Sequence, residues 1–301
     1  MNQTMRLSDF FQRYRGEVIT VVGSGGKTSL MWFLARCFAG KDTDRGRRVL
    51  VTTTTKMGAP DFNAGLFDHF INGSNGNGGG RGNDGGQGKG GGQGKGGSQG
   101  KGGGFGNDGI RPEPGVTFAG SRDDGSRKTA ALSFDVLASL IRCFDVTLIE
   151  GDGSRTLPLK GWADYEPVVA PETTVTVGIM PLWPVGMPVS EAVVHRLPLF
   201  TALTGAEKGD ILTAAHVAAA ITGVRGGTRR RGLFAEARGK RVLFFNQVES
   251  GDALRQAREV ADLVWAAPET NLDTVIAGSV KRNAVAVLAD QSAEQRSGSV
   301  C

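Results

Sequence analysis

The chain has 301 residues, 39% hydrophobic and 22% charged, with a formal net charge of +5, which is enough apolar material to bury one large core or two small ones. No apolar run is long enough to span a bilayer, and residues 1–7 lack the apolar core of a signal peptide. These features exclude the membrane-spanning class, and we expect a cytoplasmic protein without a membrane partner. Cys37, Cys143 and Cys301 form no metal-binding or disulfide pattern, as is typical of a reducing compartment.

The first predicted strand, residues 17–22, runs into a glycine turn and then into a helix over residues 28–38. Glycines let a polyphosphate approach the backbone N–H groups of such a turn, and the helix N-terminus adds a favourable dipole. The residues predicted to form this phosphate cradle are Gly23, Ser24, Gly25, Gly26, Lys27, Thr28 and Ser29. Lys27 would neutralise the β- and γ-phosphates as a catalytic residue, and the Thr28 hydroxyl would hold Mg²⁺. The loop reads G-x-x-G-K-T and is shorter than the standard G-x-x-x-x-G-K-[ST], in which Val21 would be glycine.

A cluster of threonines follows the second predicted strand, residues 48–52. Four hydroxyl groups and the amine of Lys56 lie in residues 52–56, at the carboxyl end of that strand. They suit Mg²⁺ or a terminal phosphate, and Thr54 is predicted to contact the nucleotide. The alternative is a run of β-forming residues that frays into a loop.

Residues 72–109 are dominated by glycine and contain a six-residue repeat rich in lysine and glutamine. Such a segment cannot bury enough apolar area to offset its backbone entropy, so we predict a disordered insertion. A solvated low-complexity insert is the favoured interpretation, and contact of its lysines with nucleic acid or an acidic partner is the alternative.

Two carboxylates lie at the end of the third predicted strand, residues 145–150, which comes after a helix capped by Ser133. Glu150 and Asp152 are separated by one glycine and can face the same pocket. An apolar strand that ends in carboxylates suits Mg²⁺ coordination and the orientation of a water molecule. Both are therefore predicted as catalytic residues, with Thr28 and Asp152 as the metal ligands, although which carboxylate takes which role stays open. An Asp-Gly turn is the alternative.

Further strands are predicted over residues 174–180, 241–246 and 274–277, and helices begin at Asp210 and Asp252. Asn246 ends a strand and is followed by Gln247 and Glu249, a partial match to the Asn-Lys-x-Asp signal for guanine. Asn246 is thus predicted to bind the nucleotide, with ATP and GTP both open.

The alternation of apolar strands and helices predicts an α/β, P-loop NTPase-like fold, with a mainly parallel sheet and helices on both faces. Residues 1–71 and 110–285 would form a single domain interrupted by the insertion, and residues 286–301 would form a C-terminal tail. In such sheets ligands bind outside the carboxyl ends of the strands.

Several motifs occur together in an order that resembles the YqeC family of selenium-dependent hydroxylase accessory proteins. They are residues 23–30, 51–57, 149–155, 157–160, 166–168, 194–196 and 245–248. The resemblance implies an association with molybdenum hydroxylases and the maturation of their cofactor. Two departures are the glycine-rich insertion and Tyr165, which stands where a histidine is expected before Glu166.

We therefore expect a Mg²⁺-dependent protein that binds and hydrolyses ATP or GTP. Resemblance adds an accessory role in maturing a selenium-dependent molybdenum hydroxylase, with that enzyme or its maturation machinery as partner. The alternative is an ATP-dependent small-molecule ligase or kinase, in which Lys160, His195 and Arg196 would contact the substrate. A nucleic-acid binder that works through the insertion is a third class, and we expect no nucleic-acid partner.

Overall fold

The computed structural model describes residues 4–40, 46–58, 60, 64–73, 112–122, 128–225, 227–229, 231–267 and 270–291. Most of the predicted insertion, residues 74–109, lies outside this description, as do residues 292–301 of the predicted tail. Within the described residues, no helix combines the length and the apolar character needed to cross a bilayer.

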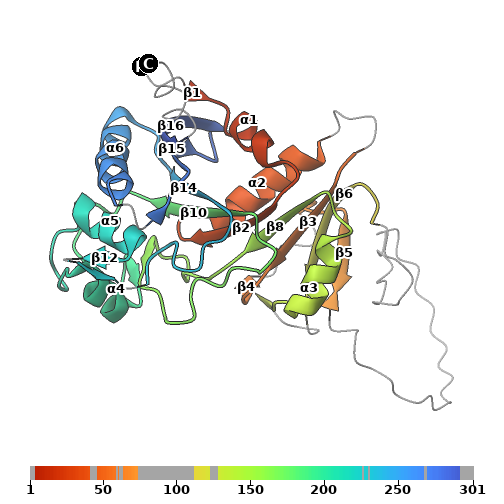
Figure 1. Cartoon of the computed structure of the whole chain (residues 1–301), viewed down its shortest axis with the longest axis horizontal. Helices are drawn as coiled ribbons and strands as arrows, with labels where there is room; N and C mark the ends of the chain where they lie inside the picture. Colours follow the sequence, from red (N-terminus) through yellow and green to blue (C-terminus); the bar gives the residue numbers. More distant parts are fainter. Residues whose placement is uncertain are drawn as a thin grey trace, which may run out of the picture.

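Figure 1 shows strands and helices that alternate along most of the chain. In chain order they are β1 (Thr4–Met5), α1 (Leu7–Phe11), the 3-10 helix η1 (Gln12–Tyr14), β2 (Val18–Gly23), α2 (Lys27–Ala39), β3 (Arg48–Thr53), β4 (Met57–Gly58), β5 (His69–Asn72), β6 (Gly115–Gly120), β7 (Lys128–Thr129), α3 (Phe134–Ile141), β8 (Val146–Glu150), β9 (Leu159–Lys160), β10 (Val175–Pro181), β11 (Val194–His195), α4 (Leu197–Thr204), α5 (Ala214–Thr222), β12 (Val224–Arg225), β13 (Thr228–Arg229), β14 (Lys240–Asn246), α6 (Gly251–Trp265), β15 (Thr274–Ser279) and β16 (Ala284–Asp290).

One large sheet contains ten of these strands, in the order β1-β16-β15-β14-β10-β2-β8-β3-β6-β5. All neighbours pair in parallel except β16, which is antiparallel to both β15 and β1. Strands such as β2 and β10 are buried on both faces, which explains why their sequences are continuous apolar runs. The prediction of an α/β fold with a mainly parallel sheet is confirmed, and β2 lies at its centre.

Helices cover both faces of the sheet, so neighbouring residues of one strand lie in different hydrophobic cores. Val21 packs with α1 and α2, whereas Val22 packs with α4, α5 and α6. On the second face α3 covers the part of the sheet that contains Leu50 and Ile149, away from α4 to α6 (Figure 1). Full burial of each such aliphatic side chain contributes about 1.5–3 kcal/mol, so this layering fixes the strand ends that carry the polar residues.

Two predicted boundaries differ from the structure by more than two residues. The helix expected from Asp210 begins at Ala214, because the Thr213 hydroxyl accepts from the His216 N–H at 3.2 Å and caps it. Asp210 instead accepts from the Glu207 N–H in the preceding turn. At the C-terminal end, β16 includes residues 286–290, which were assigned to the tail. Its antiparallel pairing along β15 satisfies the backbone groups of that stretch.

Asn72, the first residue of the predicted insertion, is the last residue of β5. Its side-chain amide donates to the Arg122 carbonyl at 3.2 Å and accepts from the Arg122 N–H at 3.1 Å. β5 and β6 are parallel neighbours in the sheet.

Replacing residues 74–109 by a flexible joint of about a dozen residues, the usual minimum for a parallel crossover, is expected to change Tm by only a few degrees. Their composition offers few apolar side chains to bury, and a shorter loop costs slightly less entropy to close. Calorimetric melting of the parent and the shortened chain measures this, and a drop of 10 °C or more, on the order of several kcal/mol in a chain of this size, would show that the segment stabilises the body.

Candidate functional site

Three glycines, one at the end of β2 and two between β2 and α2, have backbone conformations that other residues rarely adopt. Their φ angles are 100° at Gly23, 75° at Gly25 and 128° at Gly26. A Cβ at Gly25 would collide with the Pro181 ring, and one at Gly26 would lie 2.5 Å from Nδ2 of Asn246. No side chain caps α2, so the N–H groups of its first turn are open to an anion. Thr28 and Ser29 in that turn are exposed, whereas the Ser24 hydroxyl donates to the Pro158 carbonyl at 2.5 Å and is buried.

Lys27 and Thr28, the first two residues of α2, contact the ends of β2 and β8. Lys27 folds back over the loop, and its Nζ donates to the Gly23 carbonyl at 2.6 Å. The Thr28 hydroxyl donates to Oε2 of Glu150 at 2.8 Å, across from the end of β8. The ammonium, the hydroxyl and one carboxylate thus lie around a single glycine loop.

Burial raises the pKa of Glu150 above its usual range, although the Lys27 charge and the Thr28 hydrogen bond oppose the shift. The folded protein therefore retains this proton to higher pH than the unfolded chain does. The resulting stabilisation is present below the ordinary carboxyl pKa and is lost as pH rises through the raised value.

Glu150→Gln is accordingly expected to melt above the parent protein at neutral pH in metal-free buffer. A difference of about 2–4 °C corresponds to about 1 kcal/mol in a chain of this size, and it should shrink as the pH falls toward 4.5. Thermal melts over a pH series measure it, with Glu207→Gln, an exposed glutamate, as the matched control. A Tm difference that is the same at pH 4.5 and pH 8 would contradict this assignment.

Asp152 lies on the buried side of the loop, not on the side that is open to solvent. Its Oδ1 accepts from the Gly23 N–H at 3.0 Å, and its Oδ2 contacts Nζ of Lys160 at 2.5 Å. Asp152 and Lys160 are both 0% exposed. The sequence placed Mg²⁺ on Thr28 and Asp152, but the carboxylate that Thr28 meets is Glu150.

Lys160 has no surface from which to contact a substrate, which corrects its expected role in the ligase or kinase alternative. Its Nζ lies 3.1 Å from Oε2 of Glu166, which also pairs with Arg196. Burial would raise the pKa of Glu166, but the Arg196 hydrogen bond and the Lys160 charge outweigh it and lower that pKa. This chain of charges, buried except at Arg196, was missed from sequence, although a lysine flanked by Leu159, Gly161 and Trp162 is a signal for it.

Asn246 reaches the loop from β14, in register with Pro181 of β10. Its Nδ2 donates to the Gly25 carbonyl at 2.9 Å, and its Oδ1 accepts from the Val280 N–H at 3.1 Å. The amide therefore fixes the loop. Glu249, the acidic residue of the partial guanine signal, accepts from the Ser279 hydroxyl at 2.8 Å and pairs with Arg282, so a guanine base would compete with these contacts.

Thr54 lies next to the end of β8. Its hydroxyl donates to the Val168 carbonyl at 2.7 Å, and its N–H donates to the Glu150 carbonyl at 3.0 Å. These bonds join the loop after β3 to the end of β8 and to the loop between β9 and β10, and the contact of Thr54 with a nucleotide stays a prediction.

The short ribbon of β9 and β11 brings two more predicted residues to this edge of the sheet. His195 pairs in register with Lys160, and Arg196 follows it. Partial burial lowers the pKa of His195, and the charges of Arg196, Lys160 and Arg155 lower it further. Among the described residues, the non-glycine positions with φ in the left-handed region, asparagines aside, are Arg155, Thr156, Arg196 and Gln247. All four follow strand ends at this edge, where strained backbone is typical of functional sites.

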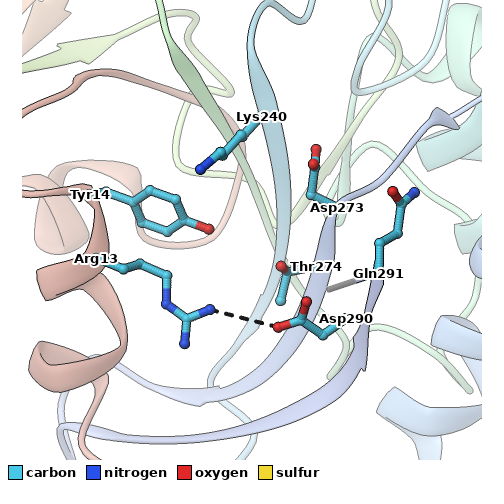
Figure 2. Close-up of a pocket in the computed structure, with 7 residues that line it drawn as sticks. All are labelled: Arg13, Tyr14, Lys240, Asp273, Thr274, Asp290 and Gln291. Carbon is cyan, nitrogen blue, oxygen red and sulfur yellow. Dashed lines mark ion pairs between the residues drawn. The ribbon is translucent and has the colours of Figure 1, made fainter. Parts of the chain in front are cut away.

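A separate cavity of about 140 Å³ lies at the amino ends of β14 and β15, opposite the strand ends that carry the phosphate loop (Figure 2). Arg13 and Tyr14 face it from η1, and Arg13 lies 3.7 Å from Asp290. Burial raises the pKa of Tyr14, which lines the same cavity. Because Lys240 and Asn246 are the two ends of β14, the length of that strand separates this cavity from the phosphate loop.

In the described parts of the chain, no group of three or more His, Cys, Asp or Glu residues is placed to hold a metal ion. Mg²⁺ is commonly bound by one or two carboxylates together with substrate phosphates and water. Thr28 and Glu150 fit that pattern, so a metal here would depend on a bound polyphosphate.

The family model described as YqeC protein matches residues 19–198 of this chain. The chain belongs to the YqeC family. A relative from Escherichia coli (strain K12), "Uncharacterized protein YqeC", is 29% identical over 205 residues, which cover 65% of this chain and 64% of the relative. The YqeC match runs from β2 to the start of α4 and includes Lys27, Thr28, Glu150 and the buried charge chain, whereas Asn246 lies beyond it.

Proposed function

We propose that this protein binds and hydrolyses a nucleoside triphosphate, ATP or GTP, with Mg²⁺ at the loop between β2 and α2. The arrangement of Lys27 and Thr28 carries the proposal: the ammonium lies 2.6 Å from the Gly23 carbonyl, and the hydroxyl lies 2.8 Å from Glu150. A polyphosphate would offer the buried ammonium charged acceptors in place of one neutral carbonyl. The P-loop NTPase-like fold belongs to the same proposal and is supported by the position of β8 beside β2.

Each residue has a role that follows from its contacts. The N–H groups of Gly25, Gly26 and the first turn of α2 would bind phosphate oxygens, and Lys27 would neutralise them. Thr28 and Glu150 would hold Mg²⁺, which when bound neutralises charge on the β- and γ-phosphates. Glu150 takes the metal role in place of Asp152, because both oxygens of Asp152 are engaged behind the loop.

The cellular role proposed here is an accessory step in maturing a selenium-dependent molybdenum hydroxylase, with that enzyme or its cofactor-maturation machinery as the partner. Family membership and the resemblance of the sequence support it. A cytoplasmic location is proposed with it.

Mass spectrometry of nucleotide released from the purified protein, followed by calorimetry with ATP and GTP, tests the proposal. We expect one nucleotide to be recovered or to bind with Mg²⁺ at a stoichiometry near 1. Absence of binding by both triphosphates would overturn the proposed function.

The ligase or kinase alternative is supported by one observation, the presence of His195 and Arg196 at the same edge of the sheet. In that case the two side chains would contact an acidic or hydroxylic acceptor. Stoichiometric phosphoryl transfer to an added acceptor would favour this alternative, whereas slow hydrolysis without an acceptor favours the accessory nucleotidase.

A further inference from the structure

Lys160 is a fully buried lysine in a short strand, 0% exposed, at the edge of the sheet that carries the phosphate loop. Burial of an ammonium group is costly unless charged partners and hydrogen bonds compensate it. A position of this kind therefore calls for a specific role.

Three oxygen acceptors surround the ammonium group of Lys160. They are Oδ2 of Asp152 at 2.5 Å, the Gly153 carbonyl at 2.9 Å and Oε2 of Glu166 at 3.1 Å. An ammonium has three N–H donors, so its hydrogen-bonding capacity matches these acceptors. Arg196 pairs with Glu166 at the other end of this group of charges. The group therefore contains two cations and two carboxylates, and its formal charges cancel.

One end of this chain of charges touches the phosphate loop. Oδ1 of Asp152 accepts from the N–H of Gly23, whose carbonyl in turn receives Nζ of Lys27. A charged acceptor makes the stronger kind of hydrogen bond. The orientation of the first loop residue is thus set by a carboxylate whose other oxygen is held by Lys160.

We propose that Lys160 is a positioning residue, which keeps the Asp152 carboxylate directed at the Gly23 N–H and so pre-organises the loop for phosphate. The inference rests on the proposed nucleotide site and assigns Asp152 to the loop rather than to the metal. Loss of the Lys160 charge leaves Asp152 buried with one backbone donor, and the loop loses its anchor.

Amide hydrogen exchange tests the anchoring without any nucleotide. In Lys160→Met, exchange in residues 22–27 is expected to rise at least tenfold, while exchange in β15 rises much less. Lys208→Met, which removes an exposed lysine paired with Glu191, serves as the matched control. Unchanged loop exchange, or an equal rise in β15, would reduce Lys160 to a general structural role and overturn the inference.

A double-mutant cycle on nucleotide affinity provides the second readout. Lys160→Met and Asp152→Asn are each expected to weaken binding about tenfold, and the double variant, which contains neither buried charge, should bind no more weakly than either single variant. The ratio of affinities with and without Mg²⁺ should stay at the parent value in all three. Additive losses, or a changed Mg²⁺ ratio, would overturn the inference. If the parent binds no triphosphate while loop exchange still responds to Lys160→Met, the proposed function fails and the anchoring stands.

Discussion

Lys27→Ala is expected to lower the affinity for Mg²⁺-bound triphosphate by about 10- to 150-fold. This range converts the 1.5–3 kcal/mol typical of a charged hydrogen bond at about 1.4 kcal/mol per tenfold change in Kd. The variant should still fold, because among the described residues the Lys27 ammonium donates only to the Gly23 carbonyl, within the same loop. Calorimetric titration of parent and variant measures the difference.

Lys208→Ala is the matched control for that experiment, because it removes a lysine that is exposed and paired with Glu191. Its affinity should equal that of the parent. An unchanged affinity in a folded Lys27→Ala variant would remove the phosphate cradle from the proposal.

The two carboxylates after β8 are expected to respond differently to substitution. Glu150→Gln removes the charge beside Thr28 and should weaken Mg²⁺-dependent binding or turnover at least tenfold, with little change in metal-free binding. Asp152→Asn should weaken both kinds of binding by the same factor, because its carboxylate contacts Gly23 and Lys160.

A titration of Mg²⁺ at fixed nucleotide in the parent and both variants separates these roles. A larger Mg²⁺ defect in Asp152→Asn than in Glu150→Gln would restore Asp152 as the metal ligand. Superimposable curves for all three proteins would remove the metal site altogether.

The phosphate loop could be predicted from the sequence because the residues within and next to it determine its local structure. The apolar run before Gly23 and the helical spacing after Lys27 predicted a strand, a turn and a helix, and β2 and α2 follow within one residue of the expected limits. The central strand β8 was equally well marked, since a strand buried on both faces is a continuous apolar run.

The features that the sequence did not predict depend on contacts between segments that are distant in the sequence. Which of Glu150 and Asp152 meets Thr28 follows from the path of the loop after β8, and two residues separated by one glycine give no local signal for it. The pairing of Asn72 with Arg122 and the antiparallel return of β16 also arise only once the sheet is assembled. Lys160 could have been suspected, because an isolated lysine in an apolar run requires a buried counter-charge.

Titration with nucleoside triphosphate, diphosphate and free nucleoside tests most directly whether the loop between β2 and α2 is a phosphate site. We expect affinity to fall stepwise as phosphates are removed and to be lost for the nucleoside, with the difference between tri- and diphosphate abolished in Lys27→Ala. Equal binding of nucleoside and triphosphate by the parent, or a difference between tri- and diphosphate in Lys27→Ala as large as in the parent, would contradict the proposed function.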